Sequence, residues 1–132
     1  MIVVDASVVV AGYLREAVSP QADAVLATGP VVAPELVLGE FGNALWRAQR
    51  MGRATPEQAA AAMRRLPAQF ERLFGLAALA DAALALALRR DHPVYDCFYV
   101  ALALREGAPL VTADRRLAER FAGDAEIRLL AA

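Results

Sequence analysis

The sequence predicts an α/β fold: a single domain, residues 1–132, with a central, mostly parallel sheet of about four to five short strands flanked by helices. Short apolar runs alternate along the chain with longer segments of helical pattern, which is typical of strands covered on both faces. Proline and glycine separate these segments. The length suits one core, and 58% hydrophobic with 22% charged residues indicates a folded rather than a disordered chain.

The first half of the chain begins with a β-branched apolar run, which predicts a buried strand. Ser19 and Pro20 have the types of an N-cap and a first helical residue, and Gly52 suits a helix C-terminus. The expected elements are strand Ile2–Val4, helix Ala6–Leu14, helix Ser19–Thr28, strand Val31–Ala33 and helix Pro34–Met51.

The second half opens on a capping box, in which Thr55 and Gln58 satisfy each other's backbone amides. Gln69–Leu76 is ambiguous and is compatible with a short strand. Gly107 closes a helix that follows the break at Pro93. The expected elements are helix Thr55–Leu66, helix Ala77–Arg90, helix Val94–Glu106, strand Pro109–Thr112, helix Arg115–Ala122 and strand Ile127–Leu130.

Composition excludes several classes of protein. The longest uncharged run is 11 residues, 24–34, well short of the roughly 18 that span a bilayer. The N-terminus lacks a basic segment before its apolar run, so we expect no signal peptide and a cytoplasmic protein. One cysteine, Cys97, and one histidine, His92, argue against a disulfide and a zinc site. Carboxylates are therefore the groups expected to carry any chemistry.

Four acids occupy informative positions. Asp5 and Asp114 follow predicted strands, where ligands of open α/β sheets bind. Asp96 lies in the first turn of a helix, and Glu40 sits in an apolar helical stretch, where an unpaired carboxylate is costly. Each of the other three acids is also a plausible helix cap. If all four converge, they need a cation, and an all-oxygen site suits Mg²⁺ or Mn²⁺ and phosphodiester hydrolysis.

Four motifs carry a resemblance to a known family: VVDASV, PELVLGEFGNAL, YDCFYVALA and LVTAD, in this order. Together they resemble the PIN-domain ribonucleases and, in length and spacing, the VapC toxins of type II toxin–antitoxin pairs. The resemblance covers essentially the whole chain. One departure is Cys97, where alanine is expected after the aspartate.

The resemblance implies that the acidic quartet Asp5, Glu40, Asp96 and Asp114 is catalytic and holds one or two Mg²⁺ or Mn²⁺ ions. Ser7, Asn43 and Thr112 match supporting positions that orient carboxylates or waters. Separately, Arg47 shares a helix face with Glu40, and Arg115 follows Asp114, so both are candidates for RNA phosphate contacts, with a solvated helix face as the alternative.

The implied activity is metal-dependent endoribonucleolytic hydrolysis of tRNA, rRNA or mRNA, leaving 5′-phosphate and 3′-hydroxyl ends. The implied partners are an RNA substrate, a cognate VapB-type antitoxin and a second copy of the chain. Toxin and antitoxin would form a hetero-oligomer that meets DNA only through the antitoxin, and no membrane is involved. The target RNA is not specified by the sequence.

Two alternative functions require residues that differ from those present. A haloacid-dehalogenase-like phosphatase needs a second Asp two residues after Asp5, where Ser7 stands, and a lysine, which the chain lacks. A non-catalytic PIN-like interaction module would have lost some of the acids. Among other residues, we expect His92 in a turn, Tyr95 and Tyr99 in core packing rather than base stacking, and Trp46 in the core or a dimer interface. Without the quartet, fourteen arginines face eleven acids, a mildly basic balance compatible with RNA.

Overall fold

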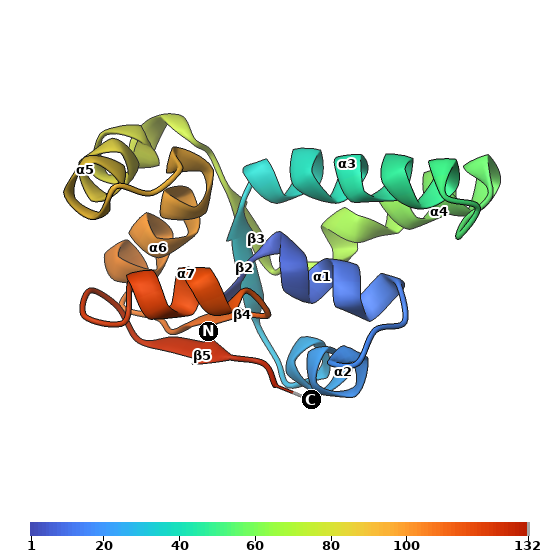
Figure 1. Cartoon of the computed structure of the whole chain (residues 1–132), viewed down its shortest axis with the longest axis horizontal. Helices are drawn as coiled ribbons and strands as arrows, with labels where there is room; N and C mark the ends of the chain where they lie inside the picture. The colour runs from blue at the N-terminus through green and yellow to red at the C-terminus, as the bar shows by residue number, and fades with distance from the viewer. Residues whose placement is uncertain (132) are drawn as a thin grey trace.

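A computed structural model describes residues 1–131, and in this range one five-stranded sheet organises the molecule (Figure 1). Every strand pair is parallel, in the order β3-β2-β1-β4-β5. The expected α/β class is confirmed, and the sheet is wholly parallel. The strands are β1 Ile2–Val4, β2 Val31–Pro34, β3 Arg72–Phe74, β4 Leu110–Thr112 and β5 Ile127–Leu129.

Seven α-helices and two short 3-10 helices connect the strands of the described chain. The helices are α1 Ala6–Tyr13, α2 Ser19–Ala27, α3 Leu36–Arg50, α4 Pro56–Arg65, α5 Ala80–Arg90, α6 Val94–Glu106 and α7 Arg115–Arg120, and the 3-10 turns are Leu66–Gln69 and Ala77–Leu79. The ambiguous segment does contain a strand, β3. The predicted helix start at Pro34 was wrong, because Pro34 pairs with Phe74 as the last residue of β2.

The sheet is covered on both sides. Figure 1 shows α1, α2, α3 and α4 to one side of the sheet and α5 and α6 to the other. Helix α6 packs on β1, β2 and β4, and α5 packs on α6. Because α6 lies between the sheet and α5, its central residues are buried in succession, from Tyr99 to Ala103. This continuous burial explains why α6 lacks a clear polar and apolar face.

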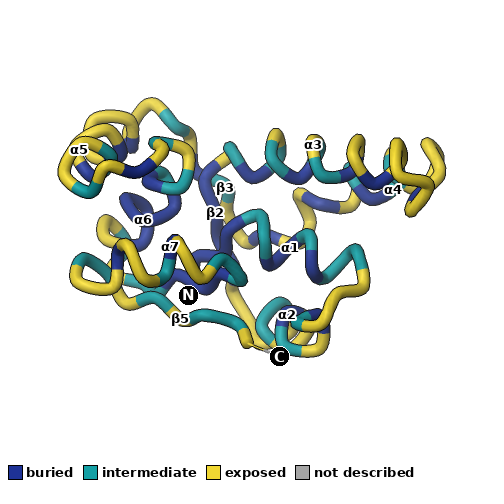
Figure 2. Tube along the Cα trace, in the orientation of Figure 1, coloured by how far each residue is buried: buried dark blue, intermediate teal, exposed yellow. Residues whose placement is uncertain are grey.

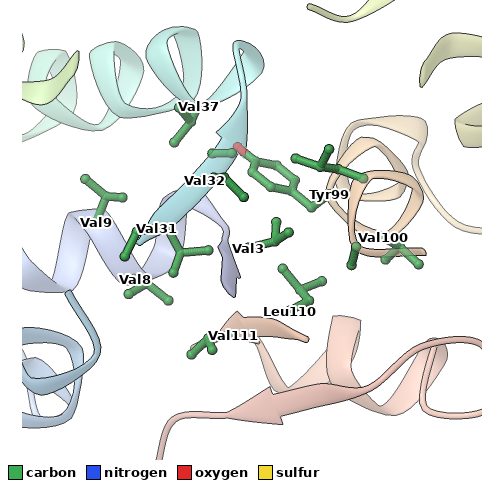
Figure 3. Close-up of a cluster of buried hydrophobic side chains, with 14 of the residues drawn as sticks. Val3, Val8, Val9, Val31, Val32, Val37, Tyr99, Val100, Leu110 and Val111 are labelled. Atoms are coloured by element: carbon green, nitrogen blue, oxygen red, sulfur yellow. The ribbon is translucent and has the colours of Figure 1, made fainter. Parts of the chain in front are cut away.

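The core is built from branched apolar side chains on the central strands (Figure 3). Val3, Val32 and Leu110 are fully buried, and the tube of Figure 2 is dark blue along these strands. Burying each such side chain stabilises the fold by about 1.5–3 kcal/mol. No helix among residues 1–131 is both long and apolar enough to cross a membrane.

The strand order creates a switch point between β1 and β4. From β1 the chain moves to β2 on one side, whereas from β4 it moves to β5 on the opposite side. At such a point the loops after the two strands diverge and leave a crevice beyond their carboxyl ends. Asp5 directly follows β1, and Asp114 lies two residues after β4. The topology therefore places two of the predicted site residues at this crevice.

Candidate active site

An open pocket of about 530 Å³ occupies this crevice. Its walls come from the turn after β1, from α3, from α6 and from the turn between β4 and α7. Glu16, in the loop between α1 and α2, adds a further carboxylate that no motif had indicated. All four acids singled out in the sequence line the pocket: Asp5, Glu40, Asp96 and Asp114.

Asp5 is the most buried of these acids, with 5% of its surface exposed. Its carboxylate accepts hydrogen bonds from the amide and hydroxyl of Ser7 at 3.1 and 2.5 Å. It also accepts from the Val8 amide at 3.4 Å and the Thr112 hydroxyl at 2.5 Å. Burial raises the pKa of Asp5 to about 6 against these lowering bonds, and the charge of Asp96 adds to the rise.

Two hydroxyls tie the turn after β1 to the turn after β4. The Ser7 hydroxyl donates to Asp5 and accepts from the amide of Ala113 at 2.8 Å. The Thr112 hydroxyl donates to Asp5 and accepts from the amide of Asp114 at 2.9 Å. Each hydroxyl thereby fixes a carboxylate and a neighbouring backbone segment at once. The structure thus puts Ser7 and Thr112 beside the acids they were predicted to support.

Asp114 is the N-cap of α7. Its Oδ1 accepts hydrogen bonds from the amides of Arg116 at 2.9 Å and Leu117 at 3.2 Å. Its Oδ2 has no hydrogen-bond partner among residues 1–131. Asp114 is therefore both a helix cap and a pocket residue. Its Oδ1 caps α7, and its Oδ2 is left for the pocket.

Glu40 is held by a phenol from the opposite side of the pocket. The Tyr99 hydroxyl donates to Glu40 Oε1 at 2.5 Å. Burial raises the pKa of Glu40, and the Tyr99 bond opposes the rise. Burial and the charge of Glu40 raise the pKa of Tyr99 far above its usual range, so the phenol keeps its proton and remains a donor. The predicted core position is confirmed for Tyr99, whose hydroxyl also reaches the site, and was wrong for Tyr95, which is 61% exposed.

Asp96 is held by a buried imidazole. His92 Nε2 lies 2.7 Å from Asp96 Oδ2, and the His92 side chain is 2% exposed. The His92 and Phe121 ring centroids lie 5.1 Å apart in an edge-to-face arrangement, and His92 Nδ1 has no hydrogen-bond partner among residues 1–131. A proton on Nε2 makes the contact with the carboxylate a hydrogen bond, whereas a proton on Nδ1 would bury an unpartnered donor. His92 is therefore more than the turn residue that its position before Pro93 suggested.

The other candidates lie differently. Arg47 lines the pocket from α3. Asn43 and Arg115 are exposed and are not among the lining residues.

Cys97 is a packing residue. It is buried, its thiol donates to the Pro93 carbonyl at 3.5 Å, and burial raises its pKa to about 11. Trp46 is 53% exposed, which excludes the core alternative for this residue.

The donor set suits a hard divalent cation. Carboxylate and hydroxyl oxygens are the ligands that Mg²⁺ and Mn²⁺ prefer, and burial raises the pKa of both Asp5 and Glu40, a cost that a cation offsets. Among residues 1–131, no group of three or more Asp, Glu, His or Cys side chains is arranged to hold a metal ion by itself. Magnesium, however, commonly keeps several waters and needs only one or two carboxylates, so the pocket fits it chemically.

Comparisons with known proteins agree with this geometry. The model of the PIN domain family matches residues 2–122. "Ribonuclease VapC3" of Pyrobaculum aerophilum is 38% identical over 123 residues, covering 91% of this chain and 94% of the relative.

Solved structures share the fold over the whole molecule. VapC20 of Mycobacterium tuberculosis, described as a sarcin-ricin loop cleaving toxin, superposes with a TM-score of 0.71 at 25% identity, covering 97% of this chain and 99% of its own. VapBC2 of Rickettsia felis, solved with a promoter DNA fragment, shares the fold with a TM-score of 0.71 at 13% identity, covering 99% and 100% of the two chains. The chain belongs to the PIN-domain family and, within it, to the VapC ribonucleases, the toxins of toxin–antitoxin pairs.

Proposed function

We propose that this chain is a Mg²⁺- or Mn²⁺-dependent endoribonuclease that, as a toxin, cuts RNA until an antitoxin neutralises it. The observation that carries this proposal is the gathering of Asp5, Glu40, Asp96 and Asp114 around one pocket at the switch point of the sheet. VapC20 is described as cleaving the sarcin-ricin loop. For this chain we propose RNA as the substrate class.

In the proposed phosphodiester hydrolysis, the pocket residues have different roles. The chemistry that a bound divalent cation supplies is activation of water and neutralisation of charge on the phosphoryl oxygens. Ser7 and Thr112 hold Asp5 in one orientation, since both carboxylate oxygens accept hydroxyl bonds. Arg47 lines the same pocket and offers a guanidinium to the substrate phosphate.

Two hydrogen-bond donors hold the remaining candidate ligands in place. Tyr99 fixes one oxygen of Glu40, and His92 fixes one oxygen of Asp96. In each case the second oxygen stays available to the pocket. Outer groups of this kind orient ligands and commonly change metal affinity or activity by about 10–100-fold when removed.

The rival functions fit the structure less well. A non-catalytic module has no need to keep four acids on one pocket. A phosphatase with Asp5 as nucleophile needs a lysine, which the chain lacks, whereas the hydroxyls of Ser7 and Thr112 both donate hydrogen bonds to Asp5. The position of a second acid is taken by Ser7, which donates one of those bonds.

Partners follow from the proposed role. We propose a VapB-type antitoxin, encoded beside this chain, that binds it in a hetero-oligomer and carries the DNA-binding function. We also propose that two copies of this chain form a homodimer. Co-purification with the product of the neighbouring reading frame tests the first partner directly.

The activity is tested with a covalently closed RNA circle and the purified protein. We expect linear products with 5′-phosphate and 3′-hydroxyl ends, loss of cleavage in EDTA, and recovery on adding Mg²⁺ or Mn²⁺. Circles that stay closed while linear RNA is degraded would show an exonuclease. Metal-independent cleavage leaving a 2′,3′-cyclic phosphate would contradict the proposed mechanism.

A further inference from the structure

Four arginines surround a second hollow, outside the carboxylate pocket. The hollow has a volume of about 420 Å³ and lies where the last turn of α5 meets α7. In Figure 1 these two helices flank α6 on the same side of the molecule. One acid is also part of the lining. The lining residues are Arg89, Arg90, Arg116, Glu119 and Arg120.

Part of this arginine hollow is fixed by hydrogen bonds. Asp124, with a side chain 8% exposed, accepts from Arg90 Nε and Nη2 at 2.8 and 3.0 Å and from Arg89 Nη2 at 2.9 Å. Arg120 Nη1 donates to the carbonyl of Arg90 at 2.9 Å, which joins the ends of the two helices. Arg90 and Arg89 lower the pKa of Asp124, so it stays ionised. Arg90 and Arg120 thus stabilise the junction itself.

Positive charge and hydrogen-bond donors remain in excess after these contacts. Four guanidinium groups face only two carboxylates, those of Glu119 and Asp124. Each guanidinium carries five N–H donors, and the four side chains together make four hydrogen bonds in the described chain. Arg116 has no ion pair with any of residues 1–131. An anion rich in acceptor oxygens matches this surplus.

The arginine hollow adjoins the wall of the carboxylate pocket. The backbone amide of Arg116 donates to Asp114 at 2.9 Å. Arg90 stands two residues before His92, whose imidazole holds Asp96 at 2.7 Å. Helix α7 has six residues and is therefore about 9 Å long at 1.5 Å per residue. A polyanion whose scissile phosphate lies among the acids reaches the arginines by extending a short way along α7.

We propose that the arginine hollow binds backbone phosphates of the RNA substrate that flank the scissile phosphodiester. This inference rests on the proposed ribonuclease function and assigns a subsite to it. RNA is favoured over an acidic peptide for two reasons. Arg116 of the hollow is hydrogen-bonded through its amide to Asp114 of the pocket proposed to hold the phosphodiester, and a planar guanidinium matches the oxygens of a phosphate bidentately. The attraction also compensates for the repulsion between the RNA and the acids of the pocket.

The test compares two double variants in binding to a fluorescein-labelled single-stranded RNA by anisotropy, in EDTA, over a range of salt concentrations. Arg89→Gln with Arg116→Gln removes two cations from the hollow but leaves Arg90 and Arg120 to hold the junction. Each phosphate contact contributes about 0.7 to the slope of log affinity against log salt for single strands. We expect the slope to become shallower by about 1.4 and binding at low salt to weaken.

The matched control is Arg64→Gln with Arg105→Gln, which changes the net charge equally. Arg64 is exposed on α4, and Arg105 lies at the end of α6 opposite Asp96. We expect this control to bind RNA with the wild-type slope.

Equal weakening by both double variants, or wild-type binding by the hollow variant, would overturn the proposal. So would a hollow variant that binds RNA normally but no longer binds the antitoxin, which would make the hollow a protein site. A wild-type protein that neither binds nor cleaves RNA would instead overturn the proposed ribonuclease function, and the subsite with it.

Discussion

The Asp5 carboxyl is almost completely buried, and this burial changes its pKa. Its ordinary pKa of 3.8 is raised to about 6, which corresponds to about 3 kcal/mol between the charged and neutral forms. Below pH 4 the folded and unfolded chains both carry the proton. As the pH rises from 4 through 6, the unfolded chain releases its proton first, so the free energy of unfolding falls. The metal-free protein is therefore least stable, with respect to this group, above pH 6.

Replacing Asp5 by Asn is expected to abolish RNA cleavage while stabilising the metal-free fold. At pH 8 the variant should melt several degrees above the wild type, because the buried charge is gone, and the difference should vanish towards pH 4. Thermal melts between pH 4 and 8 measure this. Mg²⁺ should raise the melting temperature of the wild type only. Glu35→Gln, at an exposed acid outside the pocket, is the control and should change neither property. Undiminished cleavage by the Asn variant would contradict the site.

His92 acts on the site through Asp96, and its effects on metal affinity and stability should have opposite signs. His92→Phe keeps a ring against Phe121 but removes the donor to Asp96 and the unpartnered Nδ1. We expect Mn²⁺ affinity, measured by calorimetry, to fall about 10–100-fold while the melting temperature holds or rises. His92→Gln, which keeps an N–H donor, should restore most of the affinity. Equal loss in both variants, together with a lower melting temperature, would mean that His92 only packs.

At the scale of elements, α6 connects the sheet to the pocket. One end of the helix presents Asp96, and one turn further on Tyr99 reaches across to Glu40 on α3. The core side of α6 fixes these positions, because Val100 and Leu102 beside them are fully buried. A change in the packing of α6 therefore moves Asp96 and the hydrogen-bond donor of Glu40 together.

Removing the Tyr99 hydroxyl tests this connection between α6 and α3. Tyr99→Phe should leave the fold intact, lower its stability by about 1 kcal/mol, and weaken Mn²⁺ affinity and cleavage by about 10–100-fold, because Glu40 loses its donor. Tyr95→Phe makes the same change on the same helix at a side chain that is 61% exposed, and should have no effect. The two variants compared by calorimetry and RNA cleavage give the result. Equal behaviour of both would show that the hydroxyl does not position Glu40.

Most elements could be predicted from local signals. The capping box at Thr55 and the glycine at Gly107 mark helix ends that the structure confirms. Pro34 was misplaced. Its type suits a helix start, but it also fits the last residue of β2, because it lies past the part of β1 that pairs with β2 and its missing N–H breaks no bond to that strand. The 3-10 turn Ala77–Leu79 has the composition of the helix that follows, so only tertiary packing separates the two.

The site residues that could be predicted are those whose positions follow from the sheet topology. Acids after β1 and β4 meet because parallel strands end at one edge. The contact of Tyr99 with Glu40 spans 59 residues and has no local signature. The pair His92 and Asp96 is four residues apart, a spacing that the sequence does show, yet Pro93 between them argues against a continuous helix. Glu16 reaches the pocket through a loop that carries no motif.

At the scale of the whole molecule, charge is segregated by place. The acids line the carboxylate pocket, and an excess of arginines lines the neighbouring hollow. A net charge of -1 therefore combines two local fields of opposite sign. In the proposed function, the phosphodiester backbone of the substrate would meet the positive field beside the pocket, and a divalent cation would reverse the negative field inside it.

For the proposed homodimer, apolar side chains left in solvent offer a candidate interface. Leu84 and Leu88 lie one turn apart on α5 and are 52% and 75% exposed. Trp46 on α3 is also exposed, but the guanidinium carbon of Arg50 lies 5.0 Å from the centre of its ring and covers it in part. The helical period places Leu84 and Leu88 about 100° or more around α5 from Arg89, so a dimer through this face leaves the arginine hollow open.

We expect the wild-type protein to have about twice the chain mass of 14.1 kDa in light scattering, and Leu84→Glu with Leu88→Glu to have the monomer mass. Introducing two charges into an apolar interface opposes association, whereas both positions are exposed in the single chain and tolerate them. Trp46→Glu is the matched control and should stay dimeric. A monomer produced by Trp46→Glu but not by the leucine pair would move the interface to α3, and a monomeric wild type at every concentration would contradict the homodimer.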